Sequence, residues 1–322
     1  MLYCYCDPLQ YDGKYFEKAD PYRMPGSTAD NRERQRVSIA QANEYLSSQD
    51  FVGGLSAGDI GLAAMQLESY HSDGKLISTR FYNPSGAYGS APPAHESTLT
   101  AKKAYFFIGG CAVCLGADIN SRDGAPVYTV IDNRHAAAQI SGGRITGYGE
   151  LRAFINGEET ALSSEDTART DARTVTVGGE ISYLILDGGA IKVRRTESEP
   201  PFVEILADHG VNPKCASYAY AVLPNTDAAE AERRYADRGF EILENSERIQ
   251  AVRLSGGATL CVFWEKGEIG GITASEPVLL CVNGGKRFVC DVTRRLSSVK
   301  VTLDGREYEV DLSGSDGARV EF

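Results

Sequence analysis

KKAYFFIGGCAVCLGADINSRDGAPVYTVIDNR, residues 102–134, is the stretch that decides the fold. It predicts three consecutive strands, at 104–108, 111–117 and 127–131, because each is a short apolar run of strand-forming residues. Gly109-Gly110 interrupts the first pair and the polar segment 121–125 interrupts the second, as short hairpin loops do. The first two strands are apolar on both sides of the pleat, so we expect both faces to be covered, in the middle of a sandwich.

The rest of the chain follows the same pattern of short strands bounded by Asn, Asp and Gly turns. Before residue 225 these strands are predicted at 152–155, 174–177, 181–186, 191–195, 202–206 and 218–223. One helix is predicted at 226–238, capped by Thr226 or Asp227 and ended by Gly239. Beyond it, strands are predicted at 249–254, 258–263, 278–282, 286–291, 299–303 and 306–312. This pattern is typical of an all-β protein built from antiparallel sandwiches.

Composition limits the classes of partner. The 322 residues are enough for two domains, and 42% hydrophobic and 24% charged residues are ordinary values for a globular protein. The net charge of -11 argues against nucleic acid and anionic membranes as partners. An acidic polysaccharide would be repelled as well, so binding one requires local arginines. No apolar run reaches the length of about 18 residues that a membrane span needs.

The eight cysteines are scattered along the chain. Cys111 and Cys114 have a spacing found in metal sites, but no second pair of cysteines or histidines accompanies them. The alternative is that they are buried, reduced thiols. We therefore predict no metal and no cofactor. The first residues have no signal-peptide pattern, and this and the free cysteines suggest a cytoplasmic location.

Four ordered segments resemble polysaccharide lyase family 8, the hyaluronate, chondroitin AC and xanthan lyases. They are RMPGSTAD at 23–30, FVGGLSAGDIGLAAMQLES at 51–69, the stretch 102–134 already quoted, and YAYAVLPN at 218–225. The resemblance implies a large antiparallel β-sandwich, the galactose-mutarotase-like supersandwich, at 1–225. A helical linker at 226–239 and a small C-terminal β-sandwich domain at 240–322 would follow.

The resemblance also implies a function, the β-elimination of uronic-acid-containing glycans such as hyaluronan, chondroitin or xanthan. In the family an N-terminal α/α-toroid supplies most catalytic residues, and this sequence shows no counterpart of it. We therefore expect the β portion of a lyase, inactive alone, that works with a separate or missing helical catalytic domain. Its partners would be an acidic polysaccharide and a separate toroid subunit. The alternative is a non-catalytic carbohydrate-binding or scaffold protein. Family members are usually secreted, which leaves the location open.

The family places an acidic residue after its PGTT-like turn, where it helps to orient the catalytic arginine. The matching stretch here is PGSTADNRE, so Asp30 is the first candidate for this role and Glu33 is another. Asn31 between them is a candidate substrate-binding residue. The alternative is that 30–36 is a solvated charged loop.

Three more residues are candidates for substrate binding. Tyr105 stands where the family often has Trp in a KSWFF strand, and its ring could stack on a sugar or simply pack in the core. Arg134 could meet a carboxylate with two hydrogen bonds, and Asn133 could bind hydroxyls. The alternative for both is that they secure the end of a strand. The four histidines show no metal spacing, although a His-Tyr pair in the long 70–97 loop stays open.

Overall fold

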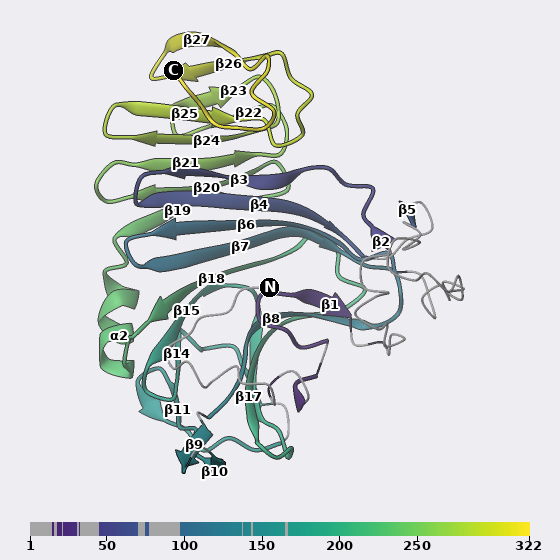
Figure 1. Ribbon diagram of the computed structural model, residues 1–322, viewed down its shortest axis with the longest axis vertical. Helices are drawn as coiled ribbons and strands as arrows, with labels where there is room; N and C mark the ends of the chain where they lie inside the picture. The colour runs from purple at the N-terminus through teal and green to yellow at the C-terminus, as the bar shows by residue number, and fades with distance from the viewer. Residues whose placement is uncertain are drawn as a thin grey trace.

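The structure is a computed structural model that describes residues 15, 18–20, 22–30, 32, 45–69, 75–76, 97–136, 138–142, 144–164 and 167–322. It is mostly β, and its strands are arranged in stacked antiparallel sheets (Figure 1). The predicted all-β class is therefore confirmed, with the supersandwich followed by a C-terminal β-sandwich.

The largest sheet has nine strands, and the decisive stretch 102–134 supplies two of its central ones. Its order is β12 (Glu158–Glu159), β11 (Ala153–Ile155), β14 (Thr174–Val177), β15 (Ile181–Asp187), β18 (Ala216–Pro224), β7 (Cys111–Asn120), β6 (Thr100–Ile108), β4 (Ile60–Glu68) and β3 (Val52–Ala57). Phe106 and Val113 pack in one buried cluster, whereas Cys114 and Ile119 pack in another. Both faces of β6 and β7 are thus covered, as their apolar composition predicts.

A five-stranded sheet covers one face of this large sheet. Its order is β1 (Thr28–Asp30), β8 (Pro126–His135), β17 (Phe202–Val211), β16 (Ala190–Arg195) and β13 (Thr167–Arg169). Two further pairs stand apart, β9 (Ala138–Ser141) with β10 (Arg144–Tyr148) and β2 (Tyr45–Leu46) with β5 (Lys75–Leu76). Apolar side chains from both large sheets meet in one cluster between them.

The predicted hairpin between the second and third strands of the decisive stretch is wrong. β7 belongs to the nine-stranded sheet and β8 to the five-stranded one, so the intervening loop carries the chain from one sheet to the other. The loop is tied to the end of β17 instead, where the Ser121 amide donates to Pro213 O at 3.1 Å and the Gly124 amide donates to Asn212 Oδ1 at 2.7 Å. Polar glycine-bearing loops serve both kinds of connection, so composition does not distinguish them.

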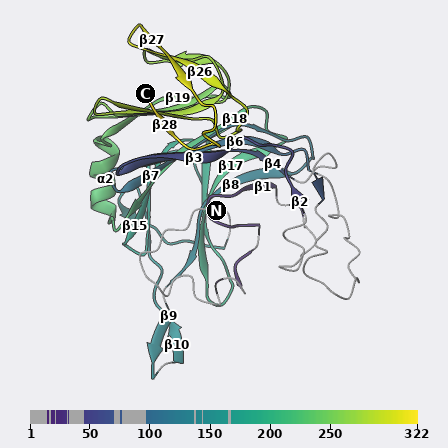
Figure 2. The same ribbon diagram turned by 45° about the horizontal axis from the view of Figure 1, so that its top comes forward.

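The C-terminal region covers the other face of the nine-stranded sheet, as Figure 2 shows. Its six-stranded sheet has the order β19 (Phe240–Asn245), β20 (Ile249–Leu254), β21 (Thr259–Phe263), β24 (Val278–Asn283), β25 (Lys286–Cys290) and β28 (Val320–Glu321). A four-stranded sheet of β22 (Gly267–Ile269), β23 (Ile272–Ala274), β26 (Ser298–Leu303) and β27 (Arg306–Asp311) completes the small sandwich. The rings of Phe51 and Trp264 meet across the contact between the two regions, with centroids 4.7 Å apart.

The predicted helix is α2 (Ala228–Ala236), between the last strand of the supersandwich and the first of the C-terminal region. The Asp227 side chain accepts a hydrogen bond from the Glu230 amide, which caps the helix as expected. The exact domain boundaries stay a prediction. Within the described ranges, no helix is long and apolar enough to cross a membrane.

Candidate functional site

The PGST turn, residues 25–28, leads into β1 at the edge of the five-stranded sheet. Hydrogen bonds to the neighbouring strand β8 fix its position. Gly26 has φ 76°, a left-handed backbone conformation that favours glycine. Its amide donates to Val130 O at 2.7 Å, and the Val130 amide donates to Ser27 O at 2.8 Å. The turn therefore continues directly into β1, which pairs antiparallel with β8.

Asp30 ends β1, and its carboxylate is buried against Arg32. The Arg32 Nη2 atom donates to Asp30 Oδ2 at 3.0 Å and to Asp123 Oδ2 at 2.9 Å. The Asp30 side chain is fully buried, whereas that of Arg32 is 24% exposed. Asp30 therefore orients an arginine of its own chain, and Arg32, which the sequence analysis did not single out, belongs to this group. Asn31 and Glu33 lie outside the described residues, so their candidate roles stay predictions.

Asp123, in the loop between β7 and β8, gathers the chain around this point. It accepts hydrogen bonds from the Thr98 amide at 2.9 Å, the Thr98 hydroxyl at 2.8 Å and the Ser97 hydroxyl at 3.0 Å. Burial alone would raise the pKa of Asp123, but these hydrogen bonds and the charge of Arg32 together lower it below its usual value. The carboxylate is thus ionised at neutral pH. We call Asp123 and the described residues of 26–32 the rim.

Tyr105 lies partly buried on β6, on the face that looks toward the five-stranded sheet. Its hydroxyl donates to Gly26 O at 3.4 Å, and its ring packs against the buried cluster between the two large sheets. Burial raises the pKa of Tyr105, so the hydroxyl stays protonated. This geometry favours the packing alternative, and sugar stacking on Tyr105 stays a prediction.

Asn133 and Arg134 are buried near the end of β8, at 1% and 3% exposure. The Arg134 guanidinium forms an ion pair with Asp132 and donates to Tyr183 Oη at 3.2 Å, inside the sandwich. A register shift in the pairing of β8 with β17 lies just before Asp132. Asn133 Nδ2 donates to Arg23 O at 2.8 Å on the opposite side. The contacts fit the alternative that both residues secure a strand, and their binding of substrate stays a prediction.

Two of the four histidines lie in the described ranges. His209 Nε2 shares a hydrogen bond with the Thr129 hydroxyl at 2.8 Å, and burial lowers its pKa to about 4. His135 Nδ1 lies 2.6 Å from Ala136 O, with its ring packed edge-on to Phe202. His135 is buried at 1% exposure, whereas His209 is partly buried. His71 and His95 lie outside the described residues.

Lys103 is a further functional candidate that the sequence analysis missed. It lies on β6, is only 2% exposed, and its ammonium group donates to Gly26 O at 2.6 Å. A signal was present, because strand alternation places Lys103 on the same side as Ala101 and Tyr105, which lie among buried residues. A lysine at a buried strand position is uncommon and calls for a specific role.

Cys111 and Cys114, whose spacing resembles that of metal sites, do not face each other. Cys111 belongs to the cluster against the C-terminal region and Cys114 to the cluster inside the supersandwich, because residues three apart on a strand point to opposite faces. In the described ranges Asp118, Cys215 and Glu247 do come close enough to share an ion. Lys102 Nζ already lies 4.0 Å from the Asp118 carboxylate, and we assign no metal there.

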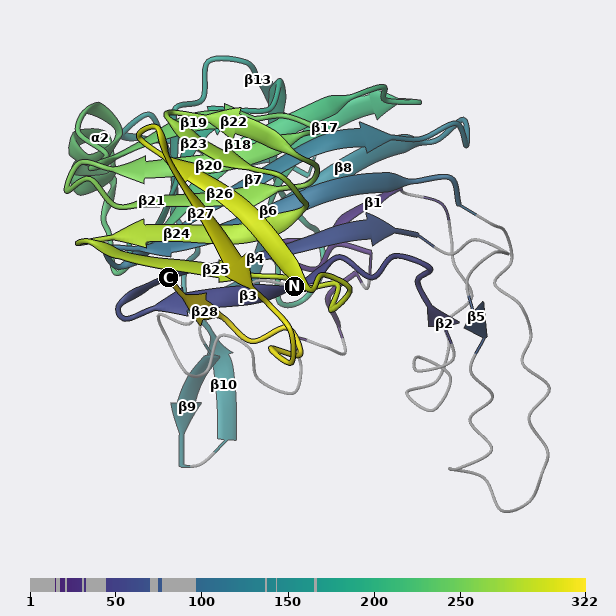
Figure 3. The ribbon, with the colours of Figure 1, turned by 90° about the horizontal axis from the view of Figure 1, so that it is seen from above.

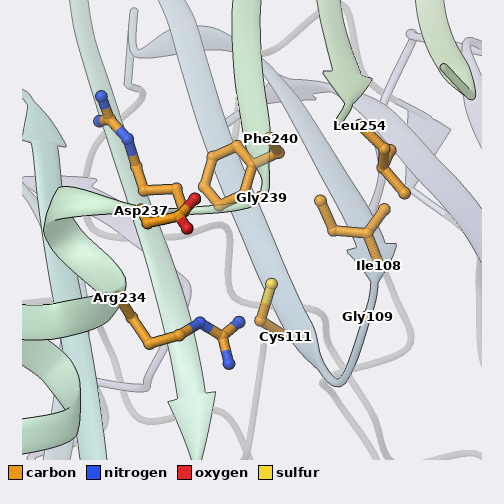
Figure 4. A pocket seen from close by; sticks show the side chains of 9 residues that line it. Ile108, Gly109, Cys111, Arg234, Asp237, Gly239, Phe240 and Leu254 are labelled. Carbon is orange, nitrogen blue, oxygen red and sulfur yellow. The ribbon is translucent and has the colours of Figure 1, made fainter. Parts of the chain in front are cut away.

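A cavity of about 360 Å³ lies at the far end of β6 and β7, next to α2 (Figure 4). The Arg234 side chain points toward Cys111 across it, with Phe240 on another side. Burial raises the pKa of Cys111, and the charge of Arg234 only partly opposes this effect. The thiol is therefore protonated at neutral pH and is not an activated nucleophile. α2 and the pair β2–β5 lie at opposite ends of the molecule (Figure 3).

Comparison with known proteins gives relatives along nearly the whole chain. The sequence is 28% identical to a hyaluronate lyase of Thermasporomyces composti over 315 residues, covering 91% of this chain and 36% of that protein. It is 28% identical to a xanthan lyase of a Bacillus species over 277 residues, covering 77% of this chain and 25% of that protein. The chain thus spans about a third or less of the length of these relatives.

Solved structures share the fold. A Paenibacillus xanthan lyase superposes with a TM-score of 0.77 at 21% identity, covering 98% of this chain and 32% of that one. A Streptomyces coelicolor A3 chondroitin AC lyase, solved in complex with chondroitin sulphate, gives a TM-score of 0.63 at 24% identity, covering 91% and 36%. Residues 1–235 match the polysaccharide lyase family 8 super-sandwich domain, and residues 241–300 match the C-terminal beta-sandwich domain of the same family. By these two matches, the chain belongs to polysaccharide lyase family 8.

Proposed function

We propose that this chain is the β part of a lyase that cleaves uronic-acid-containing glycans, such as hyaluronan, chondroitin or xanthan, by β-elimination. It works with an α-helical catalytic part, carried on the same polypeptide or on another one. The observation that carries the proposal is the match of both β regions to one family of polysaccharide lyases. The names of the relatives, hyaluronate lyase and xanthan lyase, support this substrate class.

The chemistry of the reaction supports a second part. β-elimination removes the C5 proton beside the uronate carboxylate and expels the 4-O group, so the site must neutralise that carboxylate and hold a base near the proton. In the described ranges Lys103 and Arg134 lie inside the sandwich, and His209 stays neutral above about pH 4. Lys103 and Arg134 are therefore out of reach of a polymer, and His209, partly buried and hydrogen-bonded to Thr129, offers no cation for a carboxylate. In this proposal the helical part supplies the proton-accepting base and most of the groups that neutralise the uronate carboxylate.

The rim is the contribution that we propose for the β part. The family resemblance implies that Asp30 orients the catalytic arginine of the helical part, whereas in this chain the Asp30 carboxylate accepts two hydrogen bonds from the guanidinium of Arg32. Asp123 accepts another, which fixes the guanidinium between two carboxylates. In this proposal Asp30 is a positioning residue, and the partly exposed edge of Arg32 faces the acidic glycan.

The test is the ultraviolet absorbance of the unsaturated uronate product. Hyaluronan, chondroitin sulphate and xanthan are each incubated with the chain alone and with the chain plus a helical family 8 domain. We expect product only in the second mixture. Product from the chain alone would show that the β part carries a complete active site. A mixture that binds no glycan and forms no product would reject the proposal.

A second candidate function, glycan binding without catalysis, is favoured by Phe107. Phe107 lies near the end of β6 and is 43% exposed, and its partner on the neighbouring strand β4 is Gly61. Together with Gly54 and Gly58 it lines a hollow of about 430 Å³. An exposed aromatic ring beside glycines offers a flat surface on which a sugar ring can stack.

A further inference from the structure

The buried amine of Lys103 has no use in the chemistry described so far. Lysine is almost never fully buried without a partner, because removing a charge from water costs several kcal/mol. Among the described residues no carboxylate pairs with Lys103. Its Nζ atom instead donates to Gly26 O at 2.6 Å and lies 6.0 Å and 5.9 Å from the ring centres of Tyr105 and Tyr218. A carbonyl dipole and two ring faces therefore stabilise the charge.

The carbonyl oxygen that accepts this hydrogen bond belongs to Gly26 in the PGST turn. Gly26 is buried in its left-handed conformation, and its carbonyl oxygen receives Lys103 and, at 3.4 Å, the Tyr105 hydroxyl. The amide on the other side of the same residue donates to β8. The turn is thus held from two sides, by the strand beside it and by the sheet across the sandwich.

The held turn sets the position of the rim residues that follow it, Asp30 and Arg32. Asp30 follows Gly26 by four residues, or about 13 Å of extended chain. β1 between them is short, and its pairing with β8 and the hydrogen bond between the Thr28 and Thr129 hydroxyls at 2.9 Å make it a stiff link from the turn to Asp30. A shift of the turn is therefore transmitted to Asp30 and to Arg32 beyond it.

We propose that Lys103 is a positioning residue, whose buried ammonium group holds the Gly26 carbonyl and thereby sets the place of Asp30 and Arg32 at the rim. The inference rests on the proposed function, because it assigns the rim to the glycan. It assigns to Lys103 no contact with substrate.

The surroundings make Lys103 the group that titrates inside this cluster. Burial lowers the pKa of Lys103 to about 8. On β7, burial raises the pKa of Cys114 to about 12, and on β17 burial lowers that of His209 to about 4. The same burial raises the pKa of the tyrosines that face Lys103 from β6 and β18, namely Tyr105, Tyr218 and Tyr220. Asp208, beside His209, pairs with Lys192 at 3.0 Å.

Between pH 6 and pH 9 the Cys114 thiol, the His209 imidazole and the three tyrosines keep one protonation state while Lys103 loses its charge. The hydrogen bond to Gly26 O then weakens from a charge-assisted one to a neutral one. The hydrogen bond weakens as the pH rises, but the contribution of Lys103 to the free energy of unfolding increases. The unfolded chain holds the proton up to about pH 10 and the folded chain only to about pH 8, so stability from this group rises over that interval.

The experiment compares Lys103→Met with Lys102→Met in the full chain. Lys102 is the neighbour on the opposite face of β6, where it donates to Glu247 O. Amide NMR signals of Ser27, Asp30 and Arg32 report the place of the rim, and binding of hyaluronan and chondroitin sulphate oligosaccharides reports its function. We expect Lys103→Met to shift the three signals and to weaken binding about tenfold, since small misplacements of positioned groups have large effects. Lys102→Met should leave both unchanged.

A second measurement, on the unchanged protein, keeps the proposal testable if Lys103→Met does not fold. The three amide signals should follow the titration of Lys103, with a midpoint near pH 8. Rim signals that do not move through this pH range, or a folded Lys103→Met with unchanged signals and affinity, would overturn the positioning role. If the unchanged protein binds no glycan while the signals still follow Lys103, the proposed function fails and the coupling stands.

Discussion

The ring of Tyr218 lies directly against the Cα of Gly116, so that a Cβ atom at Gly116 would stand 2.0 Å from Tyr218 Cε1. The two residues face each other on the paired strands β7 and β18. The glycine leaves room for a fully buried tyrosine between the two large sheets. Gly116 is thus required by packing, not by backbone conformation.

Gly116→Ala should lower the free energy of unfolding by about 3 kcal/mol, because overpacking a core forces side chains and backbone to shift. Urea denaturation followed by tryptophan fluorescence measures the change. Gly256→Ala is the matched control, since its added Cβ would meet nothing within 4 Å. Equal stability of the two variants would show that Tyr218 moves aside without cost.

Arg134→Met should destabilise the protein by about 3–5 kcal/mol, since it leaves the buried Asp132 carboxylate without its partner. Arg248→Met, which breaks an ion pair with Glu265 whose side chains are 56% and 54% exposed, should change stability far less, because water already solvates both charges. Both changes are measured by chemical denaturation. A stable Arg134→Met variant that fails to bind glycan would instead support Arg134 as a substrate-binding residue.

Asp123→Asn should lower stability at pH 7 by about 2 kcal/mol, because the hydrogen bonds from Thr98 and Ser97 lose their charged acceptor. The pKa of Asp123 is lowered in the folded state, so its contribution is complete above the unfolded value near 4 and is lost as the pH falls through the folded value. The difference between the two proteins should therefore shrink below pH 4. Urea denaturation at pH 7 and pH 3 tests this, with Asp59→Asn in an exposed turn as control. A difference that stays constant with pH would exclude the carboxylate as its source.

Local pattern was sufficient to predict most strands and the helix. The prediction at 249–254 coincides with β20, and the predicted helix at 226–238 contains α2. Alternation and turn residues act within a few positions, so they identify strands well. Which sheet a strand joins depends on distant partners, and for this reason the sheet change between β7 and β8 was missed.

The candidate site shows the same limit. The turn at Gly26 and the position of Asp30 follow from the family resemblance. That Arg32 also pairs with Asp123 does not follow from the local pattern, because Asp123 is distant in sequence and close in space. Arg134 is a candidate for substrate binding because arginine suits carboxylates, and the same chemistry pairs it with Asp132 inside the sandwich. Residue type predicts the kind of partner, whereas only the fold selects which partner is present.

Cys215 should react with iodoacetamide at pH 8 at least about 100-fold faster than Cys114 or Cys261. Cys215 is exposed, whereas burial raises the pKa of Cys114 to about 12 and that of Cys261 still higher. Peptide mapping by mass spectrometry at timed intervals gives the rate at each position. In urea the rates should converge, and convergence without urea would contradict the buried placement of the two thiols.

Phe107→Ala distinguishes the two candidate functions, because it removes the exposed ring without touching the rim. If the hollow beside Gly61 binds sugar by stacking, the affinity of the chain alone for neutral and acidic oligosaccharides should fall about tenfold, as expected for a lost aromatic contact of about 1.4 kcal/mol. Val211→Ala is the control, since Val211 is also exposed, at 59%, and lies at the end of β17.

If instead the β part acts through its rim, Phe107→Ala should leave glycan binding unchanged. Asp30→Asn should then weaken the binding of acidic glycans and leave that of neutral ones unchanged. Calorimetric titration with hyaluronan and with an uncharged glucan separates these results, and loss of binding in all three variants would point to misfolding, which circular dichroism detects.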